Sequence, residues 1–229
     1  MPAPTLVFDL DGTLADTAPD LLDSLNHCLA LDGMEPADPA ALRLYVGSGA
    51  RVMIERAFAA RRKALAPAKL DNLQSAFMEN YVANMPGKTR LYDGVEKALN
   101  DYASKGYILA VCTNKLEAMS VRLLHGLGVA SKFAAICGAD TFAFRKPDPR
   151  HLIETIKLAG GDPSHSIMFG DSRTDIDTAK AAGIPVIAVD FGYSDRPVRE
   201  FEPTQVISHF DEAAVSRIGH WLNAAAAQG

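Results

Sequence analysis

Two aspartates stand one residue apart at the end of an apolar run near the N-terminus. In TLVFDLDGTLADT, residues 5–17, these are Asp9 and Asp11. At an effective dielectric constant of about 20, two carboxylates about 4 Å apart repel each other by about 4 kcal/mol. The pair therefore requires a shared proton, a cation or a geometry that separates the charges. One carboxylate can act as a nucleophile and form an aspartyl phosphate, while a second donates a proton to the leaving oxygen and later accepts one from water.

Other polar residues also follow apolar runs along the chain. Ligands of open α/β sheets bind beyond the carboxyl ends of the strands, so these residues are expected to meet at one edge. Carboxylates favour Mg²⁺, which binds through one or two of them together with waters and substrate phosphate. A lysine and a threonine hydroxyl can bind the remaining phosphate oxygens. The set suits phosphoryl transfer, and it comprises Thr113, Asn114, Lys115, Asp140, Arg145, Lys146, Asp171, Ser172, Asp175 and Asp190.

Five short apolar runs indicate the elements that position these residues. They are almost continuously apolar, which is typical of strands covered on both faces. They lie at residues 5–10, 107–113, 133–139, 166–171 and 185–192. Helical patterns that end in glycine, a common residue after a helix C-terminus, alternate with them. These patterns lie at 94–106, 116–128, 149–161 and 173–183. The alternation predicts an α/β fold, a doubly wound, Rossmann-like parallel sheet.

One connection is too long for an ordinary loop between a strand and a helix. About 80 residues separate the first predicted strand from the helix near Gly94, and they contain helical stretches at 18–33, 49–65 and 68–85. We expect an inserted α-helical cap subdomain at 16–87, with a discontinuous core at 1–15 and 88–229. Asp16 or Thr17, followed by Pro19, is the expected start of its first helix.

Composition and charge describe an ordinary globular protein. Of 229 residues, 48% are hydrophobic and 22% are charged, and the net charge of −5 offers no basic field for nucleic acid or an anionic membrane. No stretch approaches the roughly 18 uninterrupted apolar residues of a membrane span, and the N-terminus lacks the basic start of a signal peptide. We therefore expect a cytoplasmic monomer or homodimer that acts on a small phosphorylated substrate.

The three cysteines also favour a reducing compartment. Cys28, Cys112 and Cys137 are an odd number, they have no CxxC spacing, and each stands in an apolar context. Such cysteines are more often buried free thiols than a disulfide framework or a zinc site. We expect all three to be buried and unpaired.

Four motifs in order resemble those of the haloacid dehalogenase superfamily, in its phosphatase branch. They are DLDGT at 9–13, TNK at 113–115, KP at 146–147 and GDSRTD at 170–175. Within that superfamily the chain looks most like phosphoglycolate phosphatases, on the stretches DLDGTLADTAPDL, VGSGARVMIERA, CTNK, RKPDP, FGDSRTDIDTAKAAG and FGY. The resemblance implies a core with a helical cap, a Mg²⁺-dependent phosphatase that forms an aspartyl phosphate, and 2-phosphoglycolate as substrate.

The resemblance also implies roles for the acidic residues. Asp9 attacks phosphorus and binds Mg²⁺, and Asp11 is the general acid and base whose backbone carbonyl reaches the metal. Asp171 is a Mg²⁺ ligand. Asp175 either binds the ion directly or orients the groups around it.

For the substrate, the resemblance implies binding residues in both the core and the cap. Thr113 and Lys146 hold the phosphoryl oxygens, with Asn114 beside them. In the cap, the glycine loop 47–51 faces the active site, and its Arg51 is the expected contact for a substrate carboxylate. Lys115 either contacts substrate or is solvated. Asp140 and Asp190 are expected either to have structural roles or to support the residues that bind the metal and the substrate.

Several other functions use the same or a similar scaffold. A sugar phosphomutase resembles this chain in every core motif and remains an alternative, as does a pyrophosphatase of the same branch. A haloacid dehalogenase does not need a second aspartate at position 11, and a phosphonatase needs a cap lysine that we do not identify. From a different class, a receiver-type signalling module also accepts phosphate on an aspartate, but its acidic pair is adjacent in sequence and it has no place for the helical insert.

Overall fold

The core of the protein is a parallel sheet that is buried on both faces. In the computed structural model, which describes residues 3–39, 46 and 49–226, the sheet has six strands in the order β5-β4-β1-β6-β7-β8, and every pair is parallel. The strands are β1 (Thr5–Phe8), β4 (Ile108–Cys112), β5 (Ala135–Cys137), β6 (Ser166–Gly170), β7 (Val186–Val189) and β8 (Gln205–Ile207). The central position of β1 places the residues that follow it at the middle of one sheet edge.

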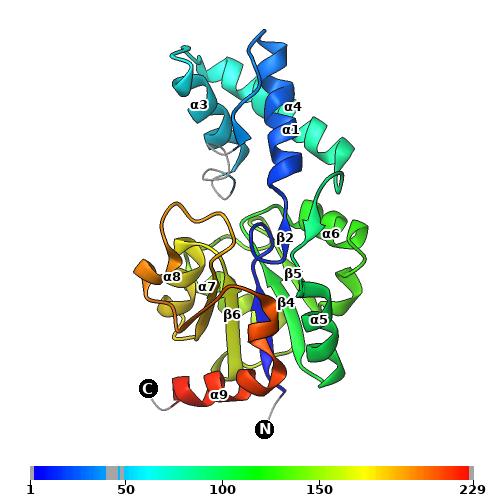
Figure 1. The fold of residues 1–229 in the computed structure, drawn as a ribbon, viewed down its shortest axis with the longest axis vertical. Coiled ribbons are helices and arrows are strands. Elements are labelled where there is room, and N and C mark those ends of the chain that lie inside the picture. Colours follow the sequence, from blue (N-terminus) through cyan, green and yellow to red (C-terminus); the bar gives the residue numbers. More distant parts are fainter. Residues whose placement is uncertain (1–2, 40–45, 47–48, 227–229) are drawn as a thin grey trace.

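Helices cover both faces of this sheet, as Figure 1 shows. Alternate residues of a strand point to opposite faces, so Leu6 and Phe8 pack with one cluster of buried side chains and Val7 packs with another. The first cluster includes residues of α5 (Val95–Ser104), α6 (Glu117–Gly126) and α9 (Val215–Ala226), and the second includes residues of α7 (Pro149–Leu158) and α8 (Arg173–Ala181). The predicted doubly wound α/β core is therefore confirmed.

The predicted strands are all present, but each is shorter than its apolar run, and one further strand of this sheet was not predicted. β8 contains only three residues at the edge of the sheet, and its sequence Gln-Val-Ile is too short to produce a recognisable apolar run. Short 3-10 helices complete the core at Ala130–Lys132, Pro163–His165, Val198–Phe201 and Phe210–Ala213.

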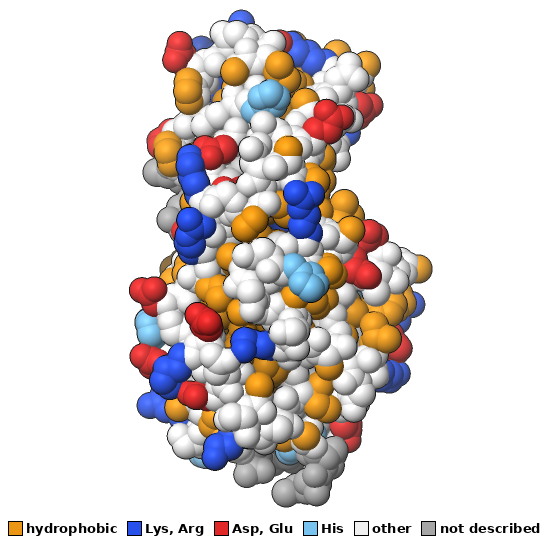
Figure 2. All heavy atoms as spheres, turned by 90° about the vertical axis from the view of Figure 1, so that its right-hand side faces the viewer, with side chains coloured by type: hydrophobic (Ala, Val, Ile, Leu, Met, Phe, Trp, Pro, Cys, Tyr) orange, Lys and Arg blue, Asp and Glu red, His pale blue; other side chains and the backbone are white. Residues whose placement is uncertain are grey.

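Three helices of the inserted segment form a second layer of structure beyond the carboxyl ends of the strands (Figure 1). They are α1 (Ala18–Leu31), α3 (Ala50–Ala60) and α4 (Pro67–Asn84). Leu25, Phe58 and Phe77 are fully or almost fully buried among them. In Figure 2 the outline of the molecule narrows between these helices and the core. We refer to α1, α3 and α4 as the cap helices; the boundaries 16–87 of the cap subdomain stay a prediction.

Two short strands that the sequence analysis missed join the cap helices to the core. β2 (Ala15–Asp16) pairs antiparallel with β3 (Arg90–Leu91), so the chain enters and leaves the insert side by side. Next to them, the buried carboxylate of Asp20 accepts hydrogen bonds from the backbone N–H of Lys88 at 2.6 Å and from the Thr89 hydroxyl at 2.6 Å. The first turn of α1 is thereby tied to the returning chain.

The start of α1 differs in detail from the expected cap. The helix begins at Ala18 after Thr17, as predicted, but the Thr17 side chain makes no capping hydrogen bond. Asp16 instead accepts a hydrogen bond from the Tyr193 hydroxyl at 2.6 Å. The Asp16 side chain therefore joins the start of the insert to the loop that carries Tyr193.

Cys28, Cys112 and Cys137 are buried free thiols, as predicted. Burial raises the pKa of Cys28 to about 11, so this thiol stays protonated at neutral pH. None of the helices among the described residues has the length and apolar character needed to cross a bilayer.

Candidate active site

Three carboxylates meet beyond the carboxyl ends of β1 and β6. Asp9 directly follows β1, Asp171 directly follows β6, and Asp175 lies in the first turn of α8. One oxygen atom of each lies within 4.8 Å of the others, and all three residues are buried. Burial raises the pKa of Asp9 to about 6, with Asp175 and Asp11 adding to the rise and Lys146 opposing it. Burial, then Asp175 and Asp9, raise the pKa of Asp171 well above its usual value.

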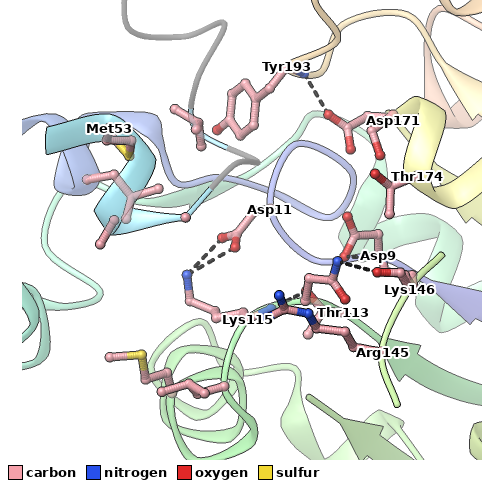
Figure 3. A pocket seen from close by; sticks show the side chains of 18 of the residues that line it. Asp9, Asp11, Met53, Thr113, Lys115, Arg145, Lys146, Asp171, Thr174 and Tyr193 are labelled. Atoms are coloured by element: carbon pink, nitrogen blue, oxygen red, sulfur yellow. Dashed lines mark hydrogen bonds and ion pairs between the residues drawn. The ribbon is translucent and has the colours of Figure 1, made fainter. Parts of the chain in front are cut away.

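Lys146 supplies one positive charge to this acidic cluster. Its ammonium nitrogen lies 2.6 Å from Asp175 Oδ1 and 3.0 Å from Asp9 Oδ1, and its side chain is 1% exposed (Figure 3). Burial opposes the charged lysine, but Asp175 and Asp9 outweigh it, so the pKa of Lys146 is raised. One cation against three buried carboxylates leaves the cluster short of positive charge.

Asp175 is held at both of its oxygen atoms. Oδ1 accepts from Lys146, and Oδ2 accepts from the Ser172 backbone N–H at 3.1 Å and from the Ser172 hydroxyl at 2.6 Å. The contact from the Ser172 backbone, together with a hydrogen bond from the Asp175 backbone N–H to the Ser172 hydroxyl at 3.4 Å, forms a capping box at the start of α8. A capping box gives partners to backbone N–H groups that have none within the helix. Asp175 thus caps the helix and orients Lys146, and direct metal binding by it stays a prediction.

The turn after Asp11 brings the backbone against Asp171. Gly12 has φ +85°, a left-handed conformation that favours glycine. A Cβ atom at this position would also lie 2.3 Å from Asp171 Oδ2, which is closer than atoms can approach. The glycine of the DLDGT motif is therefore required both for the turn and for the close approach of the loop to a cluster carboxylate.

Tyr193, which the sequence marked only as part of the FGY stretch, connects the acidic cluster to the cap helices. Its backbone N–H donates to Asp171 Oδ2 at 2.6 Å (Figure 3). Its hydroxyl donates to Asp16 at 2.6 Å and accepts from the Ala18 backbone N–H at 3.0 Å. The lone tyrosine in a loop carried no sequence signal for these contacts, because its partners are 22 to 177 residues away.

Asp11 points away from the cluster toward a second lysine. Lys115 Nζ lies 3.0 Å and 3.1 Å from the two carboxylate oxygens of Asp11, and the lysine side chain is 7% exposed (Figure 3). The same nitrogen lies 4.7 Å from the ring centroid of Tyr81 on α4. Burial opposes the charged lysine, but Asp11 and Tyr81 more than offset this and raise its pKa. Lys115 is therefore an ion-pair partner of Asp11 rather than a solvated loop residue.

The predicted phosphoryl-binding residues also lie at this edge. Thr113 follows β4, is buried, and accepts a hydrogen bond at its hydroxyl from the Lys115 backbone N–H at 3.2 Å. The Asn114 side-chain amide donates to the Lys146 backbone carbonyl at 3.0 Å. Thr113, Asn114 and Lys146 line the same pocket as Asp9 and Asp11.

Asp140 and Asp190 each accept a hydrogen bond from a neighbouring segment of the core. Asp140 Oδ1 accepts from the Glu117 backbone N–H at 2.8 Å and so caps α6. Asp190 accepts from the Ser208 hydroxyl at 2.7 Å. Neither residue lines the pocket that contains the acidic cluster.

A pocket of about 550 Å³ lies over the acidic cluster and extends to the cap helices. Its cap side is mainly apolar and includes Met53, Phe77, Met78 and Tyr81. Arg51 is not among the described residues that line it, because its guanidinium donates to Asp71 at 2.7 Å and to Gln74 at 3.3 Å. The structure therefore does not bring Arg51 to the cluster, and residues 47 and 48 of the predicted glycine loop lie outside the described residues.

The cluster fits a divalent cation on its own chemistry. All of its acidic ligand atoms are carboxylate oxygens, the donor type that Mg²⁺ prefers. Asp9 Oδ1 is buried, and among the described residues its one close cationic neighbour is the Lys146 ammonium at 3.0 Å, which Asp175 shares. A cation would supply the missing positive charge and a further partner for this oxygen.

The chain is similar to known proteins over most of its length. The family model of the haloacid dehalogenase-like hydrolases matches residues 6–189. A protein from Mesorhizobium japonicum named phosphoglycolate phosphatase is 60% identical over 225 residues, which are 98% of this chain and 99% of that protein. A protein of the same name from Agrobacterium fabrum is 51% identical over 208 residues, which are 91% of this chain and 89% of that one.

A similar fold is known from crystallography. The crystal structure of a predicted phosphoglycolate phosphatase from Haemophilus somnus is similar with a TM-score of 0.86 and 28% sequence identity. The similarity covers 92% of this chain and 96% of that one. It therefore includes both the parallel sheet and the inserted helices.

Proposed function

This chain belongs to the haloacid dehalogenase-like hydrolases and is a phosphatase, and from that premise we propose that it hydrolyses 2-phosphoglycolate with Mg²⁺ through an aspartyl phosphate. The observation that carries the proposal is the buried cluster of Asp9, Asp171, Asp175 and Lys146 at the floor of a pocket. The names of the relatives at 60% and 51% identity support 2-phosphoglycolate as the substrate.

In the proposed mechanism the two aspartates of the DLDGT motif have different roles. A carboxylate oxygen of Asp9 attacks phosphorus, the bond from phosphorus to the glycolate oxygen breaks, and Asp11 donates a proton to that oxygen. Asp11 then accepts a proton from water as the water attacks the aspartyl phosphate, which releases phosphate and restores Asp9. The separate surroundings of the two carboxylates, with Asp9 in the cluster and Asp11 beside Lys115, support this division.

Two core residues are proposed to hold the phosphoryl group during both steps. The Thr113 hydroxyl and the Lys146 ammonium both line the pocket next to Asp9, and both are buried, so water competes weakly for them. Asn114 holds the Lys146 backbone in place through its 3.0 Å hydrogen bond. The positions of these groups are set before substrate arrives.

We propose that Asp9, Asp171 and the Asp11 backbone carbonyl hold the metal ion. When bound, Mg²⁺ would neutralise charge on the phosphoryl oxygens and offset the repulsion among the carboxylates. The buried Asp9 oxygen and the raised pKa of Asp171 support this assignment. The placement of Asp175 between Ser172 and Lys146 supports an orienting role for it.

The experiment that tests the proposal is a phosphate-release screen with purified protein and Mg²⁺. The substrates are 2-phosphoglycolate, hexose phosphates, pyrophosphate and nucleotides, and we expect the highest kcat/KM for 2-phosphoglycolate. A preference for pyrophosphate, or for a hexose phosphate with formation of its isomer, would replace the proposal with the pyrophosphatase or the sugar phosphomutase. Phosphate retained on the protein without turnover would favour the receiver-type module.

We further propose a cytoplasmic monomer or homodimer that binds neither nucleic acid nor membranes. The net charge of −5 and the three buried thiols support this. On the face drawn in Figure 2, basic and acidic side chains are interspersed rather than gathered by sign. Light scattering after gel filtration measures the oligomeric state, and retention on heparin would contradict the absence of nucleic-acid binding.

A further inference from the structure

A substrate with a second anionic group requires a second cation in the pocket. The carboxylate of 2-phosphoglycolate would otherwise be desolvated near three buried aspartates, which is unfavourable. Five cationic side chains line the pocket among the residues that the structure describes. They are Arg56, Lys115, Arg145, Lys146 and Arg173.

Four of these five cations already have partners. Lys146 forms ion pairs with the cluster carboxylates Asp9 and Asp175. Lys115 forms an ion pair with Asp11. Arg173 Nε lies 3.1 Å from Asp177, one turn along α8. Arg56, on cap helix α3, also has an interaction partner.

Arg145 is the cation that remains available. Within the described part of the chain its side chain forms no hydrogen bond or ion pair, and the residue is exposed to solvent. It precedes Lys146 in the loop between β5 and α7, and Figure 3 shows its side chain beside Thr113 at the floor of the pocket. A guanidinium group presents a planar set of donors that matches a carboxylate.

We propose that Arg145 binds the second anionic group of the substrate, which for 2-phosphoglycolate is its carboxylate, and so determines substrate specificity. This inference rests on the proposed function, because it requires a substrate that carries both a phosphoryl group and another anion. It assigns recognition of the acid to the core of the protein, whereas the sequence resemblance implied Arg51 of the cap.

The position of Arg145 suits a short substrate. In a two-carbon acid the carboxylate is only a few bonds from phosphorus, so its cation must adjoin the residues that bind the phosphoryl group. Arg145 is the chain neighbour of Lys146, whose backbone is fixed on both sides by hydrogen bonds from Asn114 at 3.0 Å and to His151 Nδ1 at 3.2 Å. The base of the Arg145 side chain is therefore anchored, while its guanidinium group is free to orient.

The cap offers less to a carboxylate. Arg51 is engaged with Asp71 and Gln74, and the pocket surface contributed by Met53, Phe77 and Met78 is apolar. Such a surface suits the methylene group of the substrate rather than its charge. The two ends of the proposed substrate thus match two different walls of the pocket.

The test compares two substrates that differ only at the proposed contact. They are 2-phosphoglycolate and 2-hydroxyethyl phosphate, in which a hydroxymethyl group replaces the carboxylate. We expect Arg145→Met to raise KM for 2-phosphoglycolate about 10- to 100-fold, as for loss of a charged hydrogen bond, and to leave KM for 2-hydroxyethyl phosphate unchanged. Arg145→Lys keeps the charge without the planar donors, so we expect an intermediate KM.

Arg150→Met is the matched control. Arg150 is exposed, is paired with Asp148 and lies outside the pocket, only five residues further along the chain. Its substitution is expected to leave both KM values unchanged. Arg51→Met and Arg56→Met test the two other arginines as contacts for the carboxylate. If either variant raised KM for 2-phosphoglycolate alone, and Arg145→Met did not, the inference would be overturned.

Other outcomes are equally decisive. Equal losses on both substrates in Arg145→Met would mean that the arginine acts on the phosphoryl group, and the inference would be wrong. Failure of the proposed function appears differently, as the absence of 2-phosphoglycolate hydrolysis by the unaltered protein. In that case the two substrates are replaced by two phosphomonoesters that the protein hydrolyses, one with a further anionic group and one in which a neutral group replaces it. A selective loss of the anionic one in Arg145→Met supports the inference, and an unchanged preference overturns it.

Discussion

Lys115 places its ammonium nitrogen 3.0 Å and 3.1 Å from the two carboxylate oxygens of Asp11. The same nitrogen lies over the ring of Tyr81, at 4.7 Å from its centroid. Asp11 is a core residue and Tyr81 belongs to cap helix α4, so one cation links the proposed general acid to the cap. The ion pair holds the Asp11 side chain away from the acidic cluster and at the wall of the pocket.

Lys115→Met is expected to lower kcat about 10- to 100-fold, because Asp11 loses the partner that orients it for proton transfer. Lys115→Arg keeps a cation at this place and should retain part of the activity. Steady-state kinetics with 2-phosphoglycolate measure the effect. Tyr81→Leu removes only the ring contact and serves as the comparison, with a smaller expected loss. An unchanged kcat in Lys115→Met would contradict the positioning role.

Asp9→Asn is expected to abolish turnover, with a loss of at least about 10⁴-fold, because an amide cannot replace the carboxylate nucleophile. The fold should remain intact, since Asn has nearly the same shape and removes a charge whose burial is unfavourable. Phosphate release and thermal unfolding measure the two effects. Asp190→Asn, at an acid outside the pocket, is the control and should keep full activity. Residual turnover in Asp9→Asn near that of the control would exclude Asp9 as the nucleophile.

Removal of divalent cations is expected to abolish activity, and added Mg²⁺ should restore it. Binding to the folded state also stabilises it, so Mg²⁺ should raise the unfolding temperature in proportion to the logarithm of its concentration. Asp171→Asn removes one proposed ligand and should shift this thermal response to a Mg²⁺ concentration at least about 10-fold higher. Because the thermal shift does not depend on turnover, an identical response in both proteins would show that Asp171 does not bind the ion.

Tyr193→Phe is expected to lower the free energy of unfolding by about 1–2 kcal/mol, because the buried hydroxyl joins Asp16 to the first turn of α1. The backbone contact to Asp171 is retained in this variant, so Mg²⁺ binding should change little. Urea denaturation measures the stability. Tyr107→Phe removes a hydroxyl that has no hydrogen-bond partner among the described residues, and it should leave the stability unchanged.

His151 is expected to make the stability pH-dependent. Burial, and then the charge of Lys146, lower its pKa from 6.5 to about 4. The unfolded chain therefore binds a proton at a higher pH than the folded protein, so the stability due to neutral His151 is complete above pH 6.5 and is lost as the pH falls toward 4. The protonated ring would also carry a hydrogen on Nδ1, which accepts from the Lys146 backbone N–H.

In urea denaturation between pH 6.5 and 4, the unaltered protein should lose about 2 kcal/mol more than His151→Leu. The comparison concerns the slope with pH, and a lower stability of the variant at neutral pH does not affect it. Parallel pH profiles of the two proteins would show that His151 is not the group responsible.

Much of the fold could be predicted from local sequence patterns. The apolar runs around Val7, Val111 and Phe169 are continuous because the strands are covered on both faces, and this property is local to each run. Glycines after the helical patterns, such as Gly128 and Gly183, have the positive φ of helix ends. By contrast β2, β3 and β8 have two or three residues each, and their existence depends on partners elsewhere in the chain.

By itself the sequence determined the order of buried strands and covering helices, the insert, and the acidic, lysine and threonine residues at the strand ends. Those properties depend on residue type and on spacing within about one helix or strand. The tertiary structure alone decided which charges meet. Asp11 forms an ion pair with Lys115, which is 104 residues away, and the Tyr193 hydroxyl donates to Asp16, which is 177 residues away. The Arg51 guanidinium donates to Asp71, whereas Arg145 lines the pocket. Such pairings follow from how the elements pack and which partner is nearest, and neither is encoded in the neighbours of a residue along the chain.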